Sequence, residues 1–126
     1  MKIKNVVISN DNTKKYYFDV SEECDSHVEA CLLYLERYGY IICVSSQMGC
    51  SQKCKFCAAG PGGFIRNLTS LEIQEQVRMI VEDNPQMRSE EFQITYMGSG
   101  EPLSNYKSLC RYRFGKRNYT PLQTNI

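Results

Sequence analysis

The sequence lacks a hydrophobic run long enough to cross a membrane, and it lacks an excess of charge of either sign. Its longest apolar stretches, such as residues 41–44, are far shorter than the roughly 20 residues of a membrane-spanning helix. The formal net charge is only +1, so a nucleic-acid contact would need a local basic patch rather than the field of the whole protein. These absences argue against a membrane protein and against a generally polycationic one.

The N-terminal residues, Met1-Lys2-Ile3-Lys4-Asn5, also lack the apolar core of a secretory signal, which predicts a cytoplasmic location. The sequence has seven cysteines, and an odd number in a reducing compartment argues against a disulfide framework. Metal binding or catalysis is the better interpretation of these thiols. Three cysteines have no partner at a telling spacing and are interpreted as small buried apolar residues: Cys24, Cys31 and Cys110.

With 126 residues, 42% of them hydrophobic, the chain has the size and composition of one small globular domain. Within it, Cys50, Cys54 and Cys57 form a Cys-x3-Cys-x2-Cys run, which offers three thiolates to a metal centre. A four-iron cluster held by three cysteines leaves one iron without a protein ligand. Because a substrate or cofactor can bind at an open metal position, the spacing favours chemistry over a purely structural role.

Two short patterns at the N-terminus predict a β-hairpin. Residues 2–9 and 15–20 are apolar and β-branched enough for strands, and the polar residues 10–12 between them form a turn. Residues 28–35 are apolar enough for either helix or strand, and we expect a strand. Residues 38–45 predict a buried strand that leads into the cysteine run.

A helix is expected from Thr69 or Ser70, because residues 69–72 have the form of a capping box. Apolar residues then follow on one face, and Asn84-Pro85 ends the helix. Residues 92–97 predict the next strand, followed by a loop at residues 98–102. The order of strand, cysteine loop, helix, strand and glycine loop predicts a parallel α/β sheet with its site at the strand ends.

The last part of the chain departs from this pattern. After Pro102 a second helix is due, but its apolar periodicity soon ends, and no further strand is predicted. A basic stretch without acidic residues follows, which is typical either of an RNA-contacting arm or of a chain end cut short or read out of frame. We favour the second interpretation, since a basic stretch alone is weak evidence. Its basic residues are Lys107, Arg111, Arg113, Lys116 and Arg117.

The cysteine run, Phe56 beside its last cysteine and the Gly100-Glu101-Pro102 sequence together resemble the radical S-adenosylmethionine superfamily. Residues 43–50, 63–68 and 97–105 are similar to successive blocks of one of its families, the RlmN/Cfr-type ribosomal and transfer RNA adenine methyltransferases. The resemblance covers about residues 14–105. It implies an α/β fold, in which N-terminal strands precede the first part of a partial (β/α)6 TIM-like barrel.

The resemblance also implies roles for individual residues. Cys50, Cys54 and Cys57 would hold a 4Fe-4S cluster, whose open iron is chelated by S-adenosylmethionine. The cofactor site would include Gly98 and Gly100, as backbone that approaches the cofactor, and Glu101, as acceptor of a hydrogen bond from its ammonium group. The catalytic residues would be Cys43, which resolves a covalent RNA adduct through a disulfide, and Glu29, which moves a proton. Without the resemblance, Cys43 would be interpreted as a core residue and Glu29 as a solvated carboxylate.

In the resembling family, a methyl group carried on a cysteine near the C-terminus is activated by a carbon radical and added to adenine. The implied partners are therefore ribosomal or transfer RNA and an electron donor. No counterpart of the methyl-carrying cysteine or of the RNA-binding domain is found in these residues. A full (β/α)8 barrel needs about 250 residues, so we expect the isolated chain to be inactive in RNA methylation and to depend on a complementary chain.

The predicted organisation is a strand region at residues 1–36, the start of the barrel at 37–105 and an atypical basic tail at 106–126. Two other functions remain open. One is a small zinc-binding or RNA-binding module with Cys43 or Cys31 as a fourth ligand, although zinc sites commonly pair two Cys-x2-Cys knuckles. The other is an electron-transfer protein, although the fourth regularly spaced cysteine of a ferredoxin is missing.

Overall fold

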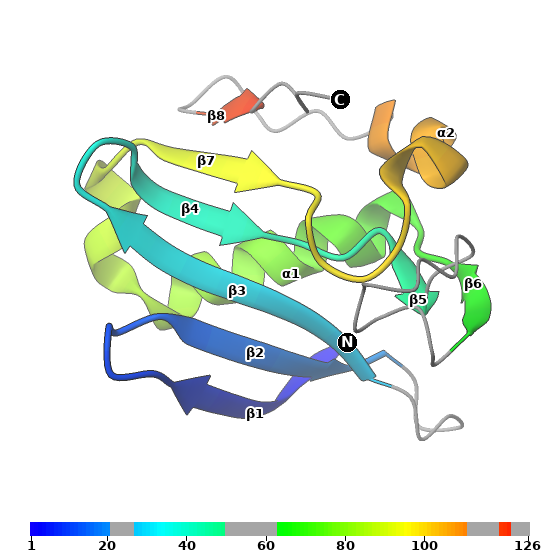
Figure 1. Ribbon diagram of the computed structural model, residues 1–126, viewed down its shortest axis with the longest axis horizontal. Coiled ribbons are helices and arrows are strands. Elements are labelled where there is room, and N and C mark those ends of the chain that lie inside the picture. Colours follow the sequence, from blue (N-terminus) through cyan, green and yellow to red (C-terminus); the bar gives the residue numbers. More distant parts are fainter. Residues whose placement is uncertain (21–26, 50–62, 111–118, 122–126) are drawn as a thin grey trace.

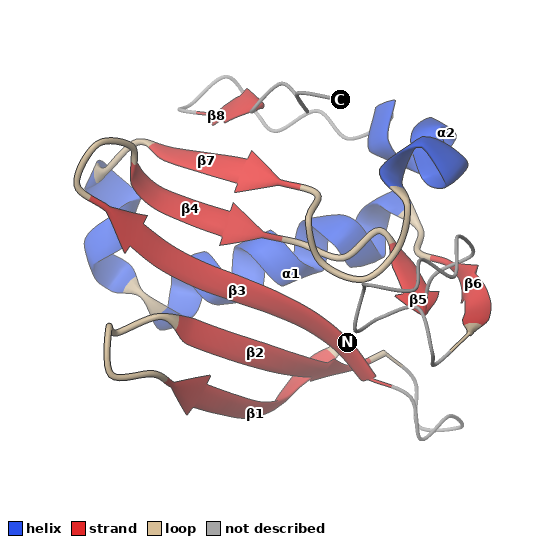
Figure 2. Ribbon diagram, in the orientation of Figure 1, coloured by secondary structure: helices blue, strands red, loops and turns tan. Residues whose placement is uncertain are grey.

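The computed structural model describes residues 1–20, 27–49, 63–110 and 119–121. Six strands form one mixed sheet in the order β1-β2-β3-β4-β7-β8, and two short strands, β5 and β6, form a separate ladder (Figure 1). The helix α1 (Ser70–Asp83) lies along one face of the large sheet, as Figure 2 shows. This is the mixed α/β architecture that the sequence predicts.

The N-terminal half of the sheet is an antiparallel meander. It runs through β1 (Lys2–Ile8), β2 (Lys14–Asp19), β3 (His27–Leu35) and β4 (Gly39–Cys43), each paired with the next. The turn between β1 and β2 contains Asn12 at φ 64°, a left-handed conformation that asparagine tolerates. The predicted hairpin, the strand at residues 28–35 and the strand leading to the cysteine run are thus confirmed.

The second half of the sheet is parallel. The strand β7 (Phe92–Thr95) pairs in parallel with β4 after the crossover through α1, as predicted for a βαβ unit. The strand β8 (Tyr119–Pro121) pairs in parallel with β7, so the prediction that no further strand follows is wrong. The strand β8 has only three residues, which is too short a pattern to predict from the sequence. It includes Pro121, which is tolerated because β8 is at the edge of the sheet.

The boundaries of α1 follow from its end residues. Thr69 accepts a hydrogen bond from the Glu72 amide, and the Glu72 carboxylate accepts one from the Thr69 amide, which completes the predicted capping box. At the other end, the Asn84 side chain donates to the Ile80 carbonyl and to the Tyr16 hydroxyl, and the 3-10 helix η1 (Pro85–Ser89) follows. Asn84 thus joins the end of α1 to the neighbouring strand β2.

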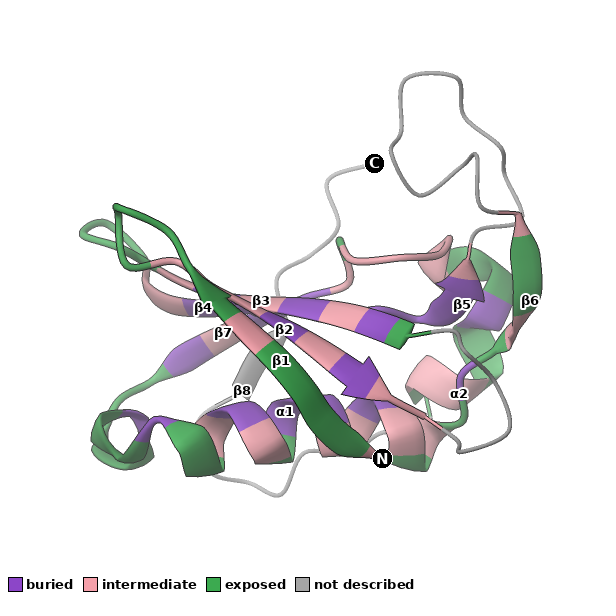
Figure 3. Cartoon of the chain, turned by 90° about the horizontal axis from the view of Figure 1, so that it is seen from below, coloured by how far each residue is buried: buried purple, intermediate pink, exposed green. Residues whose placement is uncertain are grey.

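The hydrophobic core lies between α1 and the sheet face that it covers. In β2 and β3, alternate residues are buried, as the two-residue period of a strand requires, and Figure 3 shows the buried positions along the strands and α1. Burying each large apolar side chain here stabilises the fold by roughly 1.5–3 kcal/mol. The core contains, among others, Tyr16, Phe18, Val28, Leu32, Ile42, Ile73, Val77, Ile80 and Ile94.

Two shorter segments connect the sheet to the candidate site. The strands β5 (Gln47–Gly49) and β6 (Phe64–Asn67) pair on either side of the cysteine run, and the sequence did not predict them. After β7, the glycine loop at residues 98–101 leads to the 3-10 helix η2 (Pro102–Asn105) and the short helix α2 (Tyr106–Cys110). The helix that the sequence leads us to expect after Pro102 is therefore present.

Candidate functional site

The sheet face that does not pack on α1, here called the second face, carries polar and sulfur-containing side chains. Glu29 and Cys31 of β3 lie on it, because the residues that alternate with them are buried in the core. Cys43 of β4 pairs directly with Cys31, and Thr95 of β7 pairs with Cys43. Directly paired residues share a face, so four neighbouring side chains from three strands line this part of the sheet.

Cys43 lies at the C-terminal end of β4 and is partly buried. The Thr95 hydroxyl donates a hydrogen bond to its sulfur over 3.0 Å. Because Thr95 is buried on the neighbouring strand, this bond fixes the orientation of the thiol. The structure therefore places Cys43 at a strand end, where sites form in parallel α/β folds.

Glu29 lies two residues before Cys31 and shares the second face with Cys43. Its carboxylate forms an ion pair with Lys15 over 2.7 Å and lies 3.5 Å from the His27 imidazole. The hydrogen bond to Glu29 is also the main reason that the pKa of Lys15 is raised. One third of the Glu29 side chain is exposed, so this carboxylate is both solvated and paired.

The glycine loop lies against the segment that connects β4 to β5. The Ser99 carbonyl accepts hydrogen bonds from the amides of Ser46 and Gln47, at 2.9 and 3.2 Å. In return, the Ser99 amide donates to the Ser45 hydroxyl over 2.8 Å. The loop that follows β7 is therefore attached to the chain immediately before the cysteine run.

Gly98 and Gly100 make this contact possible. A side chain on Gly98 would begin 2.8 Å from the Ser45 amide nitrogen, and one on Gly100 would begin 2.8 Å from that of Gln47. Gly100 also has φ 107°, which residues with a side chain rarely adopt. The close backbone approach that the sequence predicts toward a cofactor is here made toward Ser45 and Gln47.

Glu101 bridges the glycine loop to η2. One carboxylate oxygen accepts a hydrogen bond from the Leu103 amide over 3.0 Å and so caps this short helix. The Glu101 amide donates to the side-chain oxygen of Gln47, also over 3.0 Å. The second carboxylate oxygen is the one that could accept a further hydrogen bond from a ligand.

Three amide side chains that the sequence analysis missed hold these segments together. Gln76 of α1 is fully buried, and its amide accepts from the Ser45 amide and donates to the Ser45 carbonyl. Asn105 donates to the carbonyls of Ser46 and Leu68, and Gln47 donates to Asn67. A signal for Gln76 was present in the sequence, since this polar residue lies within the apolar face of α1.

Cys50, Cys54 and Cys57 lie outside the described residues, so their arrangement stays a prediction. The structure does describe both flanks of their segment, where Gly49 of β5 pairs with Phe64 of β6. The two flanks therefore lie side by side and adjoin the segment held by the glycine loop. In the described part of the chain, no three His, Cys, Asp or Glu side chains are grouped for metal binding. The same part contains no helix that is long and apolar enough to span a membrane.

Sequence comparison relates the chain to RNA methyltransferases, although no protein-family model matches it. It is 42% identical over 123 residues to the "Dual-specificity RNA methyltransferase RlmN" of Nitratiruptor sp., covering 87% of this chain and 34% of that protein. It is also 42% identical over 105 residues to the "Probable dual-specificity RNA methyltransferase RlmN" of Pseudothermotoga lettingae, covering 83% of this chain and 29% of that protein. The chain thus spans about a third of the length of these curated relatives.

Comparison with solved structures also relates the chain to methyltransferases. The fold is similar to the crystal structure of a radical SAM methyltransferase from Sphaerobacter thermophilus, with a TM-score of 0.77 and 29% sequence identity. The similarity covers 95% of this chain and 38% of that one, and therefore includes both the meander and the parallel strands. The sequence and the fold together show that this chain is homologous to the RlmN-type radical SAM RNA methyltransferases and corresponds to about a third of such a protein.

Proposed function

We propose that this chain is the cluster-binding and cofactor-binding part of a radical S-adenosylmethionine enzyme that methylates adenine in RNA. The observation that carries the proposal is the attachment of the glycine loop to the base of the cysteine run. The Ser99 amide donates a hydrogen bond to the Ser45 hydroxyl, and the Ser99 carbonyl accepts hydrogen bonds from the amides of Ser46 and Gln47. A cofactor that contacts both segments would thus find them already positioned relative to each other.

The residues present fit a four-iron cluster. Cys50, Cys54 and Cys57 would hold it, because thiolates are the preferred ligands of iron-sulfur clusters. The pairing of Gly49 with Phe64 keeps the two flanks of this segment together, beside the glycine loop. When bound, such a cluster supplies the electron for reductive cleavage of S-adenosylmethionine.

The chain's own residues orient the cofactor and protect the site. In this proposal the free carboxylate oxygen of Glu101 accepts a hydrogen bond from the cofactor's ammonium group, while the other oxygen stays on Leu103. Gly98 and Gly100 contribute indirectly, since they let the glycine loop lie against Ser45 and Gln47. A side chain at either position would push the glycine loop, and Glu101 with it, away from Ser45 and Gln47.

Cys43 and Glu29 are proposed to act on the RNA. The Cys43 thiol would form a disulfide that releases the covalently attached RNA, and Thr95 would orient its sulfur. Glu29 would accept a proton on the same sheet face, with Lys15 holding the carboxylate in place. The support for these roles is that β3 and β4 place both side chains on the second face.

RNA binding, reduction of the cluster and the methylation itself would need protein parts other than these residues. We propose that ribosomal or transfer RNA is the substrate, that an electron donor reduces the cluster and that the reaction takes place in the cytoplasm. The chain spans about a third of its relatives, so we propose that it does not methylate RNA alone and that a complementary chain supplies the rest.

Anaerobic reconstitution tests the proposal. The chain is incubated with iron and sulfide, and then with S-adenosylmethionine and dithionite, and 5′-deoxyadenosine is measured by liquid chromatography. We expect a brown protein with about four irons per chain that forms 5′-deoxyadenosine. Cys54→Ser should lose both properties, whereas Cys110→Ser, which changes an exposed cysteine outside the run, should keep them.

Two results would contradict the proposal. A colourless chain that retains one zinc per molecule would indicate the zinc-binding module. A brown chain that forms no 5′-deoxyadenosine, while a longer homologue does so as positive control, would indicate an electron carrier or a fragment whose cofactor site is incomplete.

A further inference from the structure

Cys31 and Cys43 lie directly opposite each other on adjacent antiparallel strands. The pairing of β3 with β4 runs without interruption from Cys31 and Cys43 to Leu35 and Gly39, so the register at the two cysteines is fixed by several neighbouring pairs. Directly opposite residues in such strands have their Cα atoms about 4.5–5.5 Å apart. Disulfides in proteins span about 4.4–6.8 Å between Cα atoms, so the backbone need not move for a bond to form.

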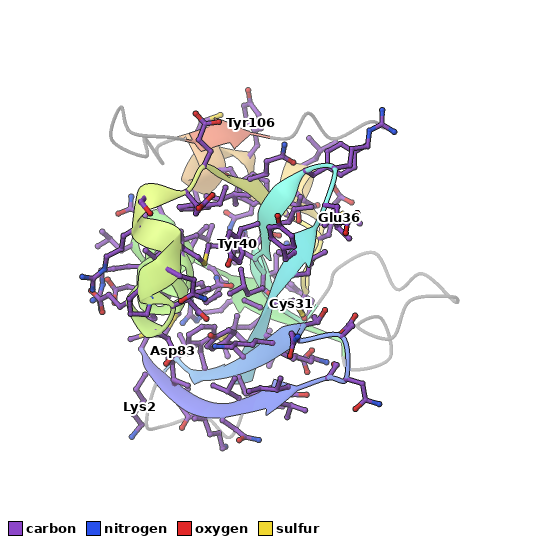
Figure 4. The ribbon with its side chains drawn as sticks, turned by 90° about the vertical axis from the view of Figure 1, so that its left-hand side faces the viewer. Lys2, Cys31, Glu36, Tyr40, Asp83 and Tyr106 are labelled. Atoms are coloured by element: carbon purple, nitrogen blue, oxygen red, sulfur yellow. The ribbon has the colours of Figure 1, made fainter. Side chains whose placement is uncertain are left out.

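Both thiols are also accessible from the same side. Each residue is partly exposed and is a free cysteine in this structure, and both lie on the second face (Figure 4 labels Cys31). Burial, and after it the charge of the neighbouring Cys43, raise the pKa of the Cys31 thiol.

The groups around the pair leave both sulfurs able to react. The Thr95 hydroxyl contacts Cys43 from β7, on the side away from Cys31. Lys15 pairs with Cys31 across β2 and β3, but its ammonium is bound to the Glu29 carboxylate. Neither contact is a covalent bond or a metal bond, so nothing among these neighbours blocks a sulfur-sulfur bond.

We propose that Cys31 and Cys43 form a reversible disulfide, which makes this pair a redox-sensitive site on the second face. The oxidant would be a peroxide. One thiolate attacks a peroxide oxygen and the oxygen-oxygen bond breaks. A sulfenic acid forms, and the departing hydroxide takes up the proton that the thiol had lost, giving water. The other thiolate then attacks the sulfenic sulfur, the sulfur-oxygen bond breaks and hydroxide leaves, taking up a proton to form a second water. The two thiols lose two electrons in total, hydrogen peroxide gains them, and a dithiol reductant reverses the change.

The disulfide between Cys31 and Cys43 goes beyond the proposed function. In the proposed reaction, Cys43 would instead form a disulfide with the methyl-carrying cysteine, which these residues do not contain. The bond to Cys31 would occupy the Cys43 sulfur and withdraw it from any other reaction. Because the disulfide can be detected without a cluster, its test is independent of the reconstitution experiment.

Peptide mapping tests the proposal. The cluster-free chain is treated with hydrogen peroxide, its remaining thiols are alkylated, and it is digested without reduction by trypsin and Glu-C. These proteases separate residues 30–36, which contain Cys31 alone, from residues 38–53, which contain Cys43 and Cys50. We expect the two peptides to be linked, with fragment ions that place the bond on Cys43. Dithiothreitol should restore alkylation at both residues.

Cys31→Ser should abolish the link, and the exposed Cys110→Ser should preserve it, with circular dichroism checking that each variant is folded. Cys31→Ala provides a second variant that removes the thiol if serine disturbs the strand. A bond from Cys43 to any other cysteine would overturn the proposal. So would recovery of Cys43 as a free thiol or as a sulfinic acid after peroxide has oxidised Cys110.

Discussion

Gly100 must be a glycine for two reasons: its φ is positive, and its backbone lies close to Gln47. An experiment can separate the effects of these two reasons on stability. Its φ is 107°, and a side chain would press on the Gln47 backbone. Gly63 has a similar requirement, with φ 71°, but no atom lies within 4 Å of the position of a side chain. The two glycines therefore form a matched pair.

We predict that Gly100→Ala lowers the free energy of unfolding more than Gly63→Ala does. Both substitutions incur the left-handed penalty of about 1–2 kcal/mol. Only Gly100→Ala also forces two segments apart, which adds roughly 1–3 kcal/mol. Urea denaturation followed by circular dichroism measures the difference. Equal losses for the two variants would show that the glycine loop does not need to contact Gln47.

Glu72 predicts a dependence of stability on pH. Hydrogen bonds from Arg66, and then from the Thr69 backbone, hold the pKa of Glu72 below its ordinary value of 4.5, although partial burial opposes them. A carboxylate with a lowered pKa stabilises the fold above its unfolded pKa, and this contribution is lost as pH falls through the lowered value. The stabilisation should therefore be complete near neutral pH and disappear below pH 4.5.

The measurement is urea denaturation of the wild type and of Glu72→Gln across the acidic range. The wild type should be more stable at pH 7, and the two curves should converge as the carboxylate is protonated. Glu90→Gln, which changes an exposed glutamate beyond the end of α1, should follow the wild type throughout. A stability difference that stays constant with pH would mean that the carboxylate charge is not the cause.

At the scale of elements, one side chain joins α1 to the chain before the cysteine run. Gln76 binds both the amide and the carbonyl of Ser45, so the helix takes the place of a neighbouring strand there. Gln76→Ala would leave two buried backbone groups unsatisfied, at about 1–3 kcal/mol each.

We predict that the Ser45 amide exchanges with solvent much faster in Gln76→Ala than in the wild type, in addition to a lower urea midpoint. Hydrogen exchange measured by NMR detects this at the single amide. The control is Gln74→Ala, a partly exposed glutamine of the same helix. Unchanged protection at Ser45 would contradict the view that Gln76 holds this segment.

The elements also show what the sequence can predict. The hairpin, α1 with its capping box and the parallel strand β7 were predictable, because apolar periodicity and end residues determine them locally. The strands β5 and β6 were not, since three and four residues give little pattern and pair with each other across 14 intervening residues. The roles of Gln76 and Asn105 depend on partners 31 to 59 positions away. Local patterns carry no information about such partners.

The sequence could predict the family of the chain, but it could not predict how the described residues of the candidate site are arranged. The cysteine run and its flanking blocks identify the family because they are contiguous in sequence. The pairing of Cys31 with Cys43 is different, since it depends on the register between two strands, which the sequence alone leaves open. Cys31 was accordingly interpreted as a buried apolar residue, whereas the structure places it partly exposed beside Cys43.

At the scale of the whole molecule, the sheet ends in a strand with exposed apolar residues. β1 is the outermost strand of the order, and Ile3, Val7 and Ile8 on it are 36%, 48% and 61% exposed. An edge strand of this kind presents unpaired backbone groups and apolar side chains to other chains. We therefore expect the chain to associate with itself as its concentration rises.

Val7→Lys should reduce this association, because a charge on an edge strand opposes pairing with another strand. Leu71→Lys is the matched control, since Leu71 is 70% exposed but lies on α1. Light scattering over a concentration series measures the mean mass of each variant. A wild-type chain that remains monomeric throughout, or equal effects of the two substitutions, would contradict this expectation.

The bond between Ser99 and Ser45 has a consequence for the order of events during synthesis. The segment before the cysteine run obtains its partners from residues made some 54 positions later. Contacts so distant in sequence form slowly, and they cannot form before the later residues have left the ribosome. Residues 45–47 are thus translated long before the glycine loop that binds them. If the proposed cluster needs both segments in place, its assembly has to wait until the glycine loop has been made.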